Sequence, residues 1–313
     1  MLDDDTHRHR LDAVLRAVGS SDDQAERLLG GSVNHTYRVR RAVGADVVVR
    51  FPVDPLRSDE FPVEAWAARA AAAAGITVAR PIGHGVQDGV PFIVSEYVEP
   101  DPRPIEHPWT WLGSSARTVA SISLAEAPPS LYTRFGTDLA RAWSAHLAYN
   151  SAALVADDPL RHDGAYTSAG ALRRHFERLA AERFAFGLAH GDLAPRNLIA
   201  RGPGRAPVLI DWGAAETGPS PWTDARRVFE WAFVDATISR AEYDEFTAAA
   251  GLASPADHAT LASLTALHLV DVTRWAREQR PDLYAEYVDR CRVGLERIER
   301  IERLERIERA SGE

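Results

Sequence analysis

The segment "LAHGDLAPRNLIA" (residues 188–200) concentrates polar side chains between apolar flanks, and it decides the fold. His190, Asp192, Arg196 and Asn197 all lie within it. A polar loop on a rigid apolar scaffold is typical of a catalytic site, because chemistry requires side chains that are held in fixed positions. The residues that follow this loop indicate which chemistry it serves.

The chain continues from this loop into a short hairpin that ends in an aspartate. Two apolar runs, "LIA" (198–200) and "PVLID" (207–211), flank "RGPGRA", whose glycines and proline favour a tight turn between two strands. Asp192, Asn197 and Asp211 therefore form an ordered set of loop aspartate, nearby asparagine and aspartate after the next strand. This set serves phosphoryl transfer: the first aspartate orients a hydroxyl and accepts its proton, while the other two side chains hold Mg²⁺ on the phosphates.

Composition narrows the class of protein. A length of 313 residues favours two lobes or domains over one core. Cys291 is the single cysteine, which excludes an internal disulfide and a zinc site built from cysteines. The chain has no lysine, so all 36 basic residues are arginine and a Walker A phosphate loop is excluded.

Charge and hydropathy exclude other partners. The net charge of −9 argues against a nucleic-acid-binding surface and mildly favours a cationic or neutral substrate. No apolar run is long enough to span a membrane, and the polar start "MLDDDTHRHR" lacks the apolar core of a secretory signal. We therefore expect a cytoplasmic enzyme without membrane or nucleic-acid partners, and its oligomeric state stays open.

The first third of the chain reads as a small sheet with few helices. Residues 7–18 have helical apolar spacing, and residues 62–75 form an alanine-rich helix that ends at a glycine. β-branched runs predict strands within residues 27–41, 45–53 and 91–100.

The remainder reads as mostly helical after a proline-rich connector at residues 101–110. Helices are predicted near residues 111–126, 137–155, 168–183, 222–235, 240–250, 257–279 and from 282 onward. The final "LERIERIERLERIERA" repeats every three residues, a period that walks around a helix and offers no continuous face to bury. We therefore expect that residues 297–313 can be deleted with little loss of fold or activity.

"HGDLAPRN" followed by "IDWG" resembles the aminoglycoside phosphotransferase and choline-kinase-like family, which shares the protein-kinase fold. The resemblance covers nearly the whole chain up to about residue 295. It implies an α+β, bilobal protein-kinase-like fold with a small antiparallel-sheet N-lobe and a larger, mostly helical C-lobe. We expect a nucleotide-binding N-lobe over residues 1–99, a C-lobe with the catalytic loop and acceptor-substrate site over residues 100–294, and a charged helical tail over residues 295–313.

The resemblance implies ATP and Mg²⁺ as cofactors and a role for each site residue. Asp192 and Arg196 would be catalytic, with Arg196 directed at the transferred phosphoryl group or the acceptor hydroxyl; a solvent-facing loop arginine is the alternative. Asn197 and Asp211 would hold the metal. The nucleotide would be bound by a glycine-rich turn, a small-lobe cation with its acidic partner, and the hinge backbone: Gly31, Ser32, Asn34, Arg50, Glu64, Glu96 and Val98.

Three details of this assignment go beyond the core motif. Arg50 takes the place of a lysine, and its expected partner is Glu64, with Glu60 as the alternative. Tyr97 is a candidate to line the adenine pocket. Asp224 is expected to cap the helix that follows the metal aspartate.

The implied function is an ATP-dependent small-molecule kinase that transfers the γ-phosphate to a hydroxyl of an antibiotic, aminoglycoside-like, or of a metabolite. The alternatives are a catalytically silent nucleotide-binding or scaffold protein with the same fold, and a GTP-preferring antibiotic kinase. Retention of the complete Asp–Asn–Asp set argues against the silent alternative. No motif marks the acceptor pocket, for which the candidates are Trp109, Trp111, Glu216, Trp222 and Asp271.

Overall fold

The computed structural model describes residues 4–21, 24–28, 33–54 and 60–311. The chain divides into two compact units. The first combines Met1–Pro108, Ile122–Leu131 and Ala194–Glu216, and the second combines Trp109–Ser121, Tyr132–Leu193 and Thr217–Glu313. Gly31 and Ser32, which the sequence assigned to the nucleotide, lie outside the described residues.

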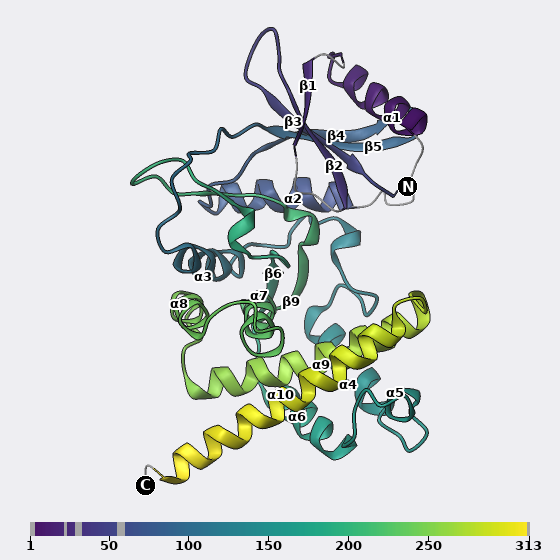
Figure 1. Cartoon of the computed structure of the whole chain (residues 1–313), viewed down its shortest axis with the longest axis vertical. Helices are drawn as coiled ribbons and strands as arrows, with labels where there is room; N and C mark the ends of the chain where they lie inside the picture. The colour runs from purple at the N-terminus through teal and green to yellow at the C-terminus, as the bar shows by residue number, and fades with distance from the viewer. Residues whose placement is uncertain (1–3, 22–23, 29–32, 55–59, 312–313) are drawn as a thin grey trace. The chain divides into compact units, whose positions relative to one another are not determined.

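The first unit is built on a five-stranded antiparallel sheet with the strand order β1-β2-β3-β5-β4 (Figure 1). The sequence did not predict β4, because its residues "PIGHGVQ" include a proline and two glycines, which are depleted in strands. β4 lies at the sheet edge, where such residues are tolerated. The strands are β1 (Ala25–Leu28), β2 (Asn34–Val39), β3 (Val47–Pro52), β4 (Pro81–Gln87) and β5 (Val90–Glu96).

Two helices cover opposite faces of this sheet, α1 (Asp4–Ala17) and α2 (Glu60–Ala73) (Figure 1). Successive side chains of a strand point to opposite faces, so the odd-numbered positions of β3 share one face. These are Val47, Val49 and Phe51, which form one buried cluster with apolar side chains of α1. Arg50, at an even-numbered position, is therefore on the α2 face.

The segment after the opening loop also belongs to the first unit. It forms the predicted hairpin, in which β7 (Leu198–Ile199) pairs antiparallel with β8 (Val208–Leu209). The Leu209 amide donates to the Thr77 carbonyl at 2.8 Å, and Val78 forms a parallel bridge with Leu209. These bonds tie the hairpin to the segment that follows α2.

The second unit is mostly helical. The 25-residue α9 (Pro255–Gln279) is its most buried helix and packs against α6, α7 and α10. A two-stranded sheet joins β6 (Phe186–Ala189) to β9 (Glu216–Pro219). The other helices are α3 (Pro108–Val119), α4 (Leu139–Ala152), α5 (Pro159–His162), α6 (Ala169–Ala181), α7 (Trp222–Phe229) with its π-helical continuation Glu230–Val234, α8 (Arg240–Ala250) and α10 (Tyr284–Ser311).

The tail, which was expected to offer no continuous face to bury, does contact the second unit at its beginning. Ile298 is completely buried, and the Arg297 side chain donates to the Val234 carbonyl. Farther along, Glu302 pairs with Arg178 at 3.5 Å. The apolar residues of the three-residue repeat do move around α10, but the first turns of the repeat still pack against the second unit. Farther along the helix the apolar side chains become exposed, as Ile307 shows.

The antiparallel sheet of one unit and the helices of the other confirm the predicted α+β, kinase-like fold class. Among the described residues, no helix combines the length and apolar character that crossing a membrane requires.

Candidate functional site

Arg50 is at the centre of a cluster of charged side chains in the first unit. Its Nη2 donates to Oε1 of Glu64, and its Nη1 donates to Oδ1 of Asp211 at 3.0 Å. Only 15% of the Arg50 side chain and 7% of the Glu64 side chain are exposed, so water screens this ion pair weakly. The Asp211 side chain is more open, at 46% exposed. Three residues that the sequence assigned to the nucleotide and the metal thus lie together.

Local structure explains why Arg50 and Glu64 meet. Arg50 pairs across the sheet with Ile93 of β5, and Ile93 packs with Phe61 and Ala65 of α2. Glu64 precedes Ala65 on the same helix and is 5% exposed. The apolar cluster therefore brings the helix against the strand, and the two opposite charges neutralise each other beside it.

Asp211 reaches this cluster from a strained turn. It follows β8 with φ 65° and ψ 60°, left-handed values that side chains other than glycine rarely adopt. The next residue, Trp212, is buried and anchors the short 3₁₀ turn Trp212–Ala214. A Cβ placed on Gly213 would be 3.5 Å from Oε2 of Glu64, so the turn passes directly beside that carboxylate. Oε2 is buried and accepts no hydrogen bond from any described residue.

The other candidates of the first unit lie around the same sheet and hairpin. The Asn34 side-chain amide donates to Oε1 of Glu60 at 2.8 Å. Glu60, the alternative partner of Arg50, thus bonds to Asn34, whereas Arg50 bonds to Glu64. Asn197 is 5% exposed, and its carbonyl accepts from the Ile210 amide at 3.0 Å across the hairpin.

The hinge residues end strand β5. The Glu96 amide donates to the Arg80 carbonyl, and the Glu96 side chain pairs with the Arg80 guanidinium. Tyr97 packs beneath the Arg38 guanidinium, which is 4.0 Å from the ring centroid. The Val98 amide makes no hydrogen bond within the described part of the chain, which leaves it available to a base edge.

Asp192 belongs to the second unit, in the loop that follows β6. The loop is held by Asp224 of α7, whose carboxylate accepts from the His190 amide at 3.0 Å and from the Gly191 amide at 2.8 Å. Both groups are buried, Asp224 at 2% exposed and His190 at 0%. The Asp192 amide donates to Nδ1 of His190, which fixes the next step of the backbone.

This arrangement corrects the role expected for Asp224. It does not cap α7: the helix begins after Pro221 without a side-chain cap, and Asp224 lies inside its first turn. Charge-assisted bonds to two loop amides are stronger than bonds between neutral groups, so Asp224 positions the loop. The sequence offered one signal for this role, an acidic residue in the first turn on an otherwise apolar face of the helix.

Sequence reasoning also missed Arg227. Its Nε lies 3.5 Å from Oδ1 of Asp192, and its guanidinium lies 5.4 Å from the Trp231 ring centroid. Arg196, which the sequence assigned to catalysis, is exposed at the start of the hairpin.

The predicted acceptor candidates divide into core and surface residues. Trp109 is buried and its indole donates to Glu242 at 3.0 Å, so it is a core residue. Trp111 and Glu216 are exposed. Trp222 is half-buried against Phe184, and Asp271 accepts from Asn150 at 2.9 Å.

Metal-binding capacity can be judged from the donor set. The described residues contain no group of three or more His, Cys, Asp or Glu side chains that could hold a metal ion. Asn197 and Asp211 offer an amide and a carboxylate oxygen. Such a sparse set of hard oxygen donors suits Mg²⁺, which retains most of its water and takes few protein ligands.

A family model described as "Phosphotransferase enzyme family" matches residues 24–264 of the chain. The chain belongs to this phosphotransferase family. The match extends from the end of the α1–β1 connection into α9 and includes every residue assigned above to catalysis, the nucleotide or the metal, whereas the acceptor candidate Asp271 lies beyond it. It confirms the family predicted from the loop and hairpin motifs. No curated protein matches the chain in sequence.

Solved phosphotransferases share the fold at low identity. A GDP complex of aminoglycoside 2'-phosphotransferase-IIIa matches with a TM-score of 0.64 and 16% identity, over 92% of this chain and 98% of that one. Macrolide 2'-phosphotransferase MphH from Brachybacterium faecium matches with a TM-score of 0.58 and 18% identity, over 91% and 98%. A streptomycin–ATP complex of APH(2")-IIa matches with a TM-score of 0.58 and 13% identity, over 93% and 96%. These matches show a common fold.

Proposed function

We propose that this phosphotransferase transfers the γ-phosphoryl group of ATP to a hydroxyl of a small molecule, either an antibiotic or a metabolite. The hydroxyl oxygen forms the new O–P bond, the bond between the γ-phosphorus and the β,γ-bridging oxygen breaks, and the hydroxyl proton passes to Asp192 before release. The products are a phosphate monoester and ADP. The observation that supports this proposal is the Arg50–Glu64–Asp211 cluster, in which two acids hold a guanidinium of the kind that binds phosphate.

The nucleotide is assigned to the first unit. Arg50 binds the α- and β-phosphates through its two-pronged guanidinium, and Glu64 holds that guanidinium in place. The Val98 amide and the Glu96 backbone take the edge of the base. This chemistry asks the protein mainly for positioning and charge neutralisation, which explains why most of the named residues are ionic.

Asn197 and Asp211 would hold Mg²⁺, whose charge offsets that of the phosphates during transfer. The unpartnered Oε2 of Glu64 beside Asp211 supports this assignment, because a buried carboxylate oxygen without a donor is costly unless positive charge or bound water is near. Asp211 changes partner in this proposal, from Arg50 to the metal.

Asp192 is the proposed base. Its loop is fixed by Asp224 and His190, so the carboxylate is held in one place before the acceptor arrives. A general base positioned in this way contributes about 10²–10⁴-fold to the rate.

The test is magnesium-dependent nucleotide consumption over a panel of antibiotics and metabolites, run with ATP and with GTP. Asp192→Asn is compared with Asp282→Asn, an exposed aspartate on the same unit. We expect phosphate ester formation by wild type and by Asp282→Asn, and a loss of about 10²–10⁴-fold in kcat for Asp192→Asn with ATP binding kept. Retention of more than about a tenth of kcat by Asp192→Asn would remove the base assignment.

A further inference from the structure

Arg227 is the cation next to the proposed catalytic base. Its Nε is 3.5 Å from Oδ1 of Asp192, and its side chain is 39% exposed. Trp231, one turn later on the same helical segment, supports the guanidinium face. The terminal nitrogens Nη1 and Nη2 donate no hydrogen bond to any residue that the structure describes.

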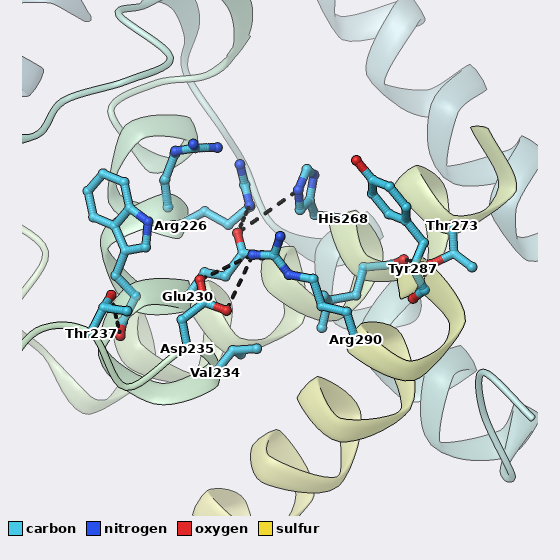
Figure 2. Close-up of polar contacts among 12 residues, drawn as sticks. Arg226, Glu230, Val234, Asp235, Thr237, His268, Thr273, Tyr287 and Arg290 are labelled. Carbon is cyan, nitrogen blue, oxygen red and sulfur yellow. Dashed lines mark hydrogen bonds and ion pairs between the residues drawn. The ribbon is translucent and has the colours of Figure 1, made fainter. Parts of the chain in front are cut away.

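Other charged side chains of the second unit form ion pairs with one another. Glu230, 3% exposed, accepts from Arg226 at 2.9 Å and from Arg290 at 2.8 Å (Figure 2). Arg290 also pairs with Asp235 at 3.1 Å. Glu230 and Asp235 are therefore bound by other arginines, and Arg227 has its ion pair with Asp192.

The three arginines of this group, Arg226, Arg227 and Arg290, are matched by three acids. Arg226 and Arg290 pair with Glu230 and Asp235, so Asp192 is the acid that pairs with Arg227. These arginines also affect His268 of α9. The pKa of its imidazole is well below the ordinary value, first because of burial and then because of the three arginines. Protonation of His268 would add a fourth cation to the group.

An acceptor hydroxyl that gives its proton to Asp192 must lie against that carboxylate. The rest of the acceptor then lies within reach of the Arg227 guanidinium, whose free nitrogens are bonded to the same carbon as Nε. Two parallel N–H groups match the geometry of a carboxylate or a phosphate. An ammonium group in the same place would meet the like charge of the guanidinium, and it would compete with the acceptor hydroxyl for Asp192.

We propose that Arg227 is a specificity-determining residue of the acceptor site and that the acceptor carries an anionic oxygen group, a carboxylate or a phosphate, close to the hydroxyl that is phosphorylated. This inference rests on the proposed function, because it uses Asp192 as the base. It runs against the mild preference for a cationic substrate that the net charge of −9 suggests. Net charge describes the whole surface, whereas recognition depends on the charges within a few ångströms of the acceptor.

Matched probes test this charge preference. Meta-(hydroxymethyl)benzoate, the corresponding benzamide and the corresponding benzylamine share one hydroxyl and one ring and differ in charge. Dissociation constants are measured by NMR titration for wild type, Arg227→Ala, Arg227→Lys and Arg292→Ala. Arg292 is the control, since it is 41% exposed and also pairs with an aspartate of the second unit.

We expect wild type and Arg292→Ala to bind the benzoate about tenfold more tightly than the benzamide, with the benzylamine weakest. In Arg227→Ala the ratio should fall to about one, and Arg227→Lys should keep part of it because the charge remains without the two-pronged geometry. Near-ultraviolet circular dichroism checks that each variant is folded.

Other outcomes overturn the inference. They are failure of wild type to bind the benzoate, equal binding of the three probes, a preference for the benzylamine, or an unchanged ratio in Arg227→Ala. A kcat that falls equally for all probes with unchanged binding ratios would place Arg227 on the transferred phosphoryl group instead. ATP consumption in the same samples separates the two proposals: an Arg227-dependent anion preference without transfer to any hydroxyl refutes the proposed function alone.

Discussion

Breaking the Arg50–Glu64 ion pair tests the centre of the proposed nucleotide site without any knowledge of the substrate. Arg50→Ala leaves the Glu64 carboxylate, 7% exposed, without its only hydrogen-bond donor among the described residues. Removing one partner of such a buried pair costs about 3–5 kcal/mol of unfolding free energy. Glu64→Ala should cost less, because Arg50 keeps its bond to Asp211 at 3.0 Å.

The double variant decides whether the two residues act as one unit. We expect Arg50→Ala/Glu64→Ala to be little less stable than Arg50→Ala alone, because the second substitution removes the stranded charge. The coupling energy should then be about 1–3 kcal/mol. Urea unfolding followed by circular dichroism measures all four proteins, and the KM for ATP should show the same lack of additivity.

A surface pair of the same sheet serves as the control. Arg40 and Glu26 also form an ion pair, at 3.0 Å, but their side chains are 67% and 54% exposed. Water and salt screen such a pair, so each alanine substitution there should change stability by about 1 kcal/mol or less. Additive effects at Arg50 and Glu64, within about 0.5 kcal/mol, would refute the reasoning.

Three further predictions concern the second unit. Asp224→Asn replaces the acceptor of two loop amides and should lower kcat about 10–100-fold while the Kd for magnesium-ATP, measured by calorimetry, is unchanged; a normal kcat would contradict its role in positioning Asp192. Burial opposes the ionisation of Asp158, but hydrogen bonds from Arg274 and Tyr166 outweigh burial and lower the pKa of this carboxyl. The ionised carboxylate therefore stabilises the fold above the ordinary aspartate pKa of about 3.9, and this stabilisation is lost as the pH falls through the lower pKa of the folded state. Arg274→Ala should therefore cost about 3–5 kcal/mol at neutral pH and less in acid, as urea unfolding at several pH values would show; a cost that does not change with pH would refute this. Ile298→Ala should cost about 2–5 kcal/mol, whereas Ile307→Ala, at a position 55% exposed, should change stability by about 0.5 kcal/mol or less, and equal melting temperatures for the two variants would show that the tail does not pack.

Local patterns predicted the parts of the site that depend on sequence spacing. The hairpin after the loop, the strand that carries Arg50 and the helix that carries Glu64 all follow from periodicity and turn residues, and the structure contains each of them. The choice of Glu64 over Glu60 as the partner of Arg50 also agrees with the geometry. The catalytic, metal and nucleotide roles stay predictions.

Features that depend on tertiary packing were not predictable in this way. The contact between Asp224 and the loop joins residues about 34 positions apart, and no pattern in either segment predicts that the two segments meet. The same holds for Arg227 beside Asp192 and for the burial of Ile298 within α10. A period of three correctly indicates that no single face continues along the tail, but it cannot show how many turns of the helix meet the core.

The identity of the cation that Glu64 holds has a consequence for chemical labelling. A guanidinium stays protonated at any pH that a folded protein tolerates, and it is not a nucleophile. None of the 313 residues is a lysine, so no lysine amine lies beside Glu64 and Asp211. Nucleotide analogues that acylate an amine near the phosphates should therefore leave the proposed site unmodified. A proteome-wide survey of ATP-binding proteins based on such reagents would then miss this enzyme even with the proposed site filled.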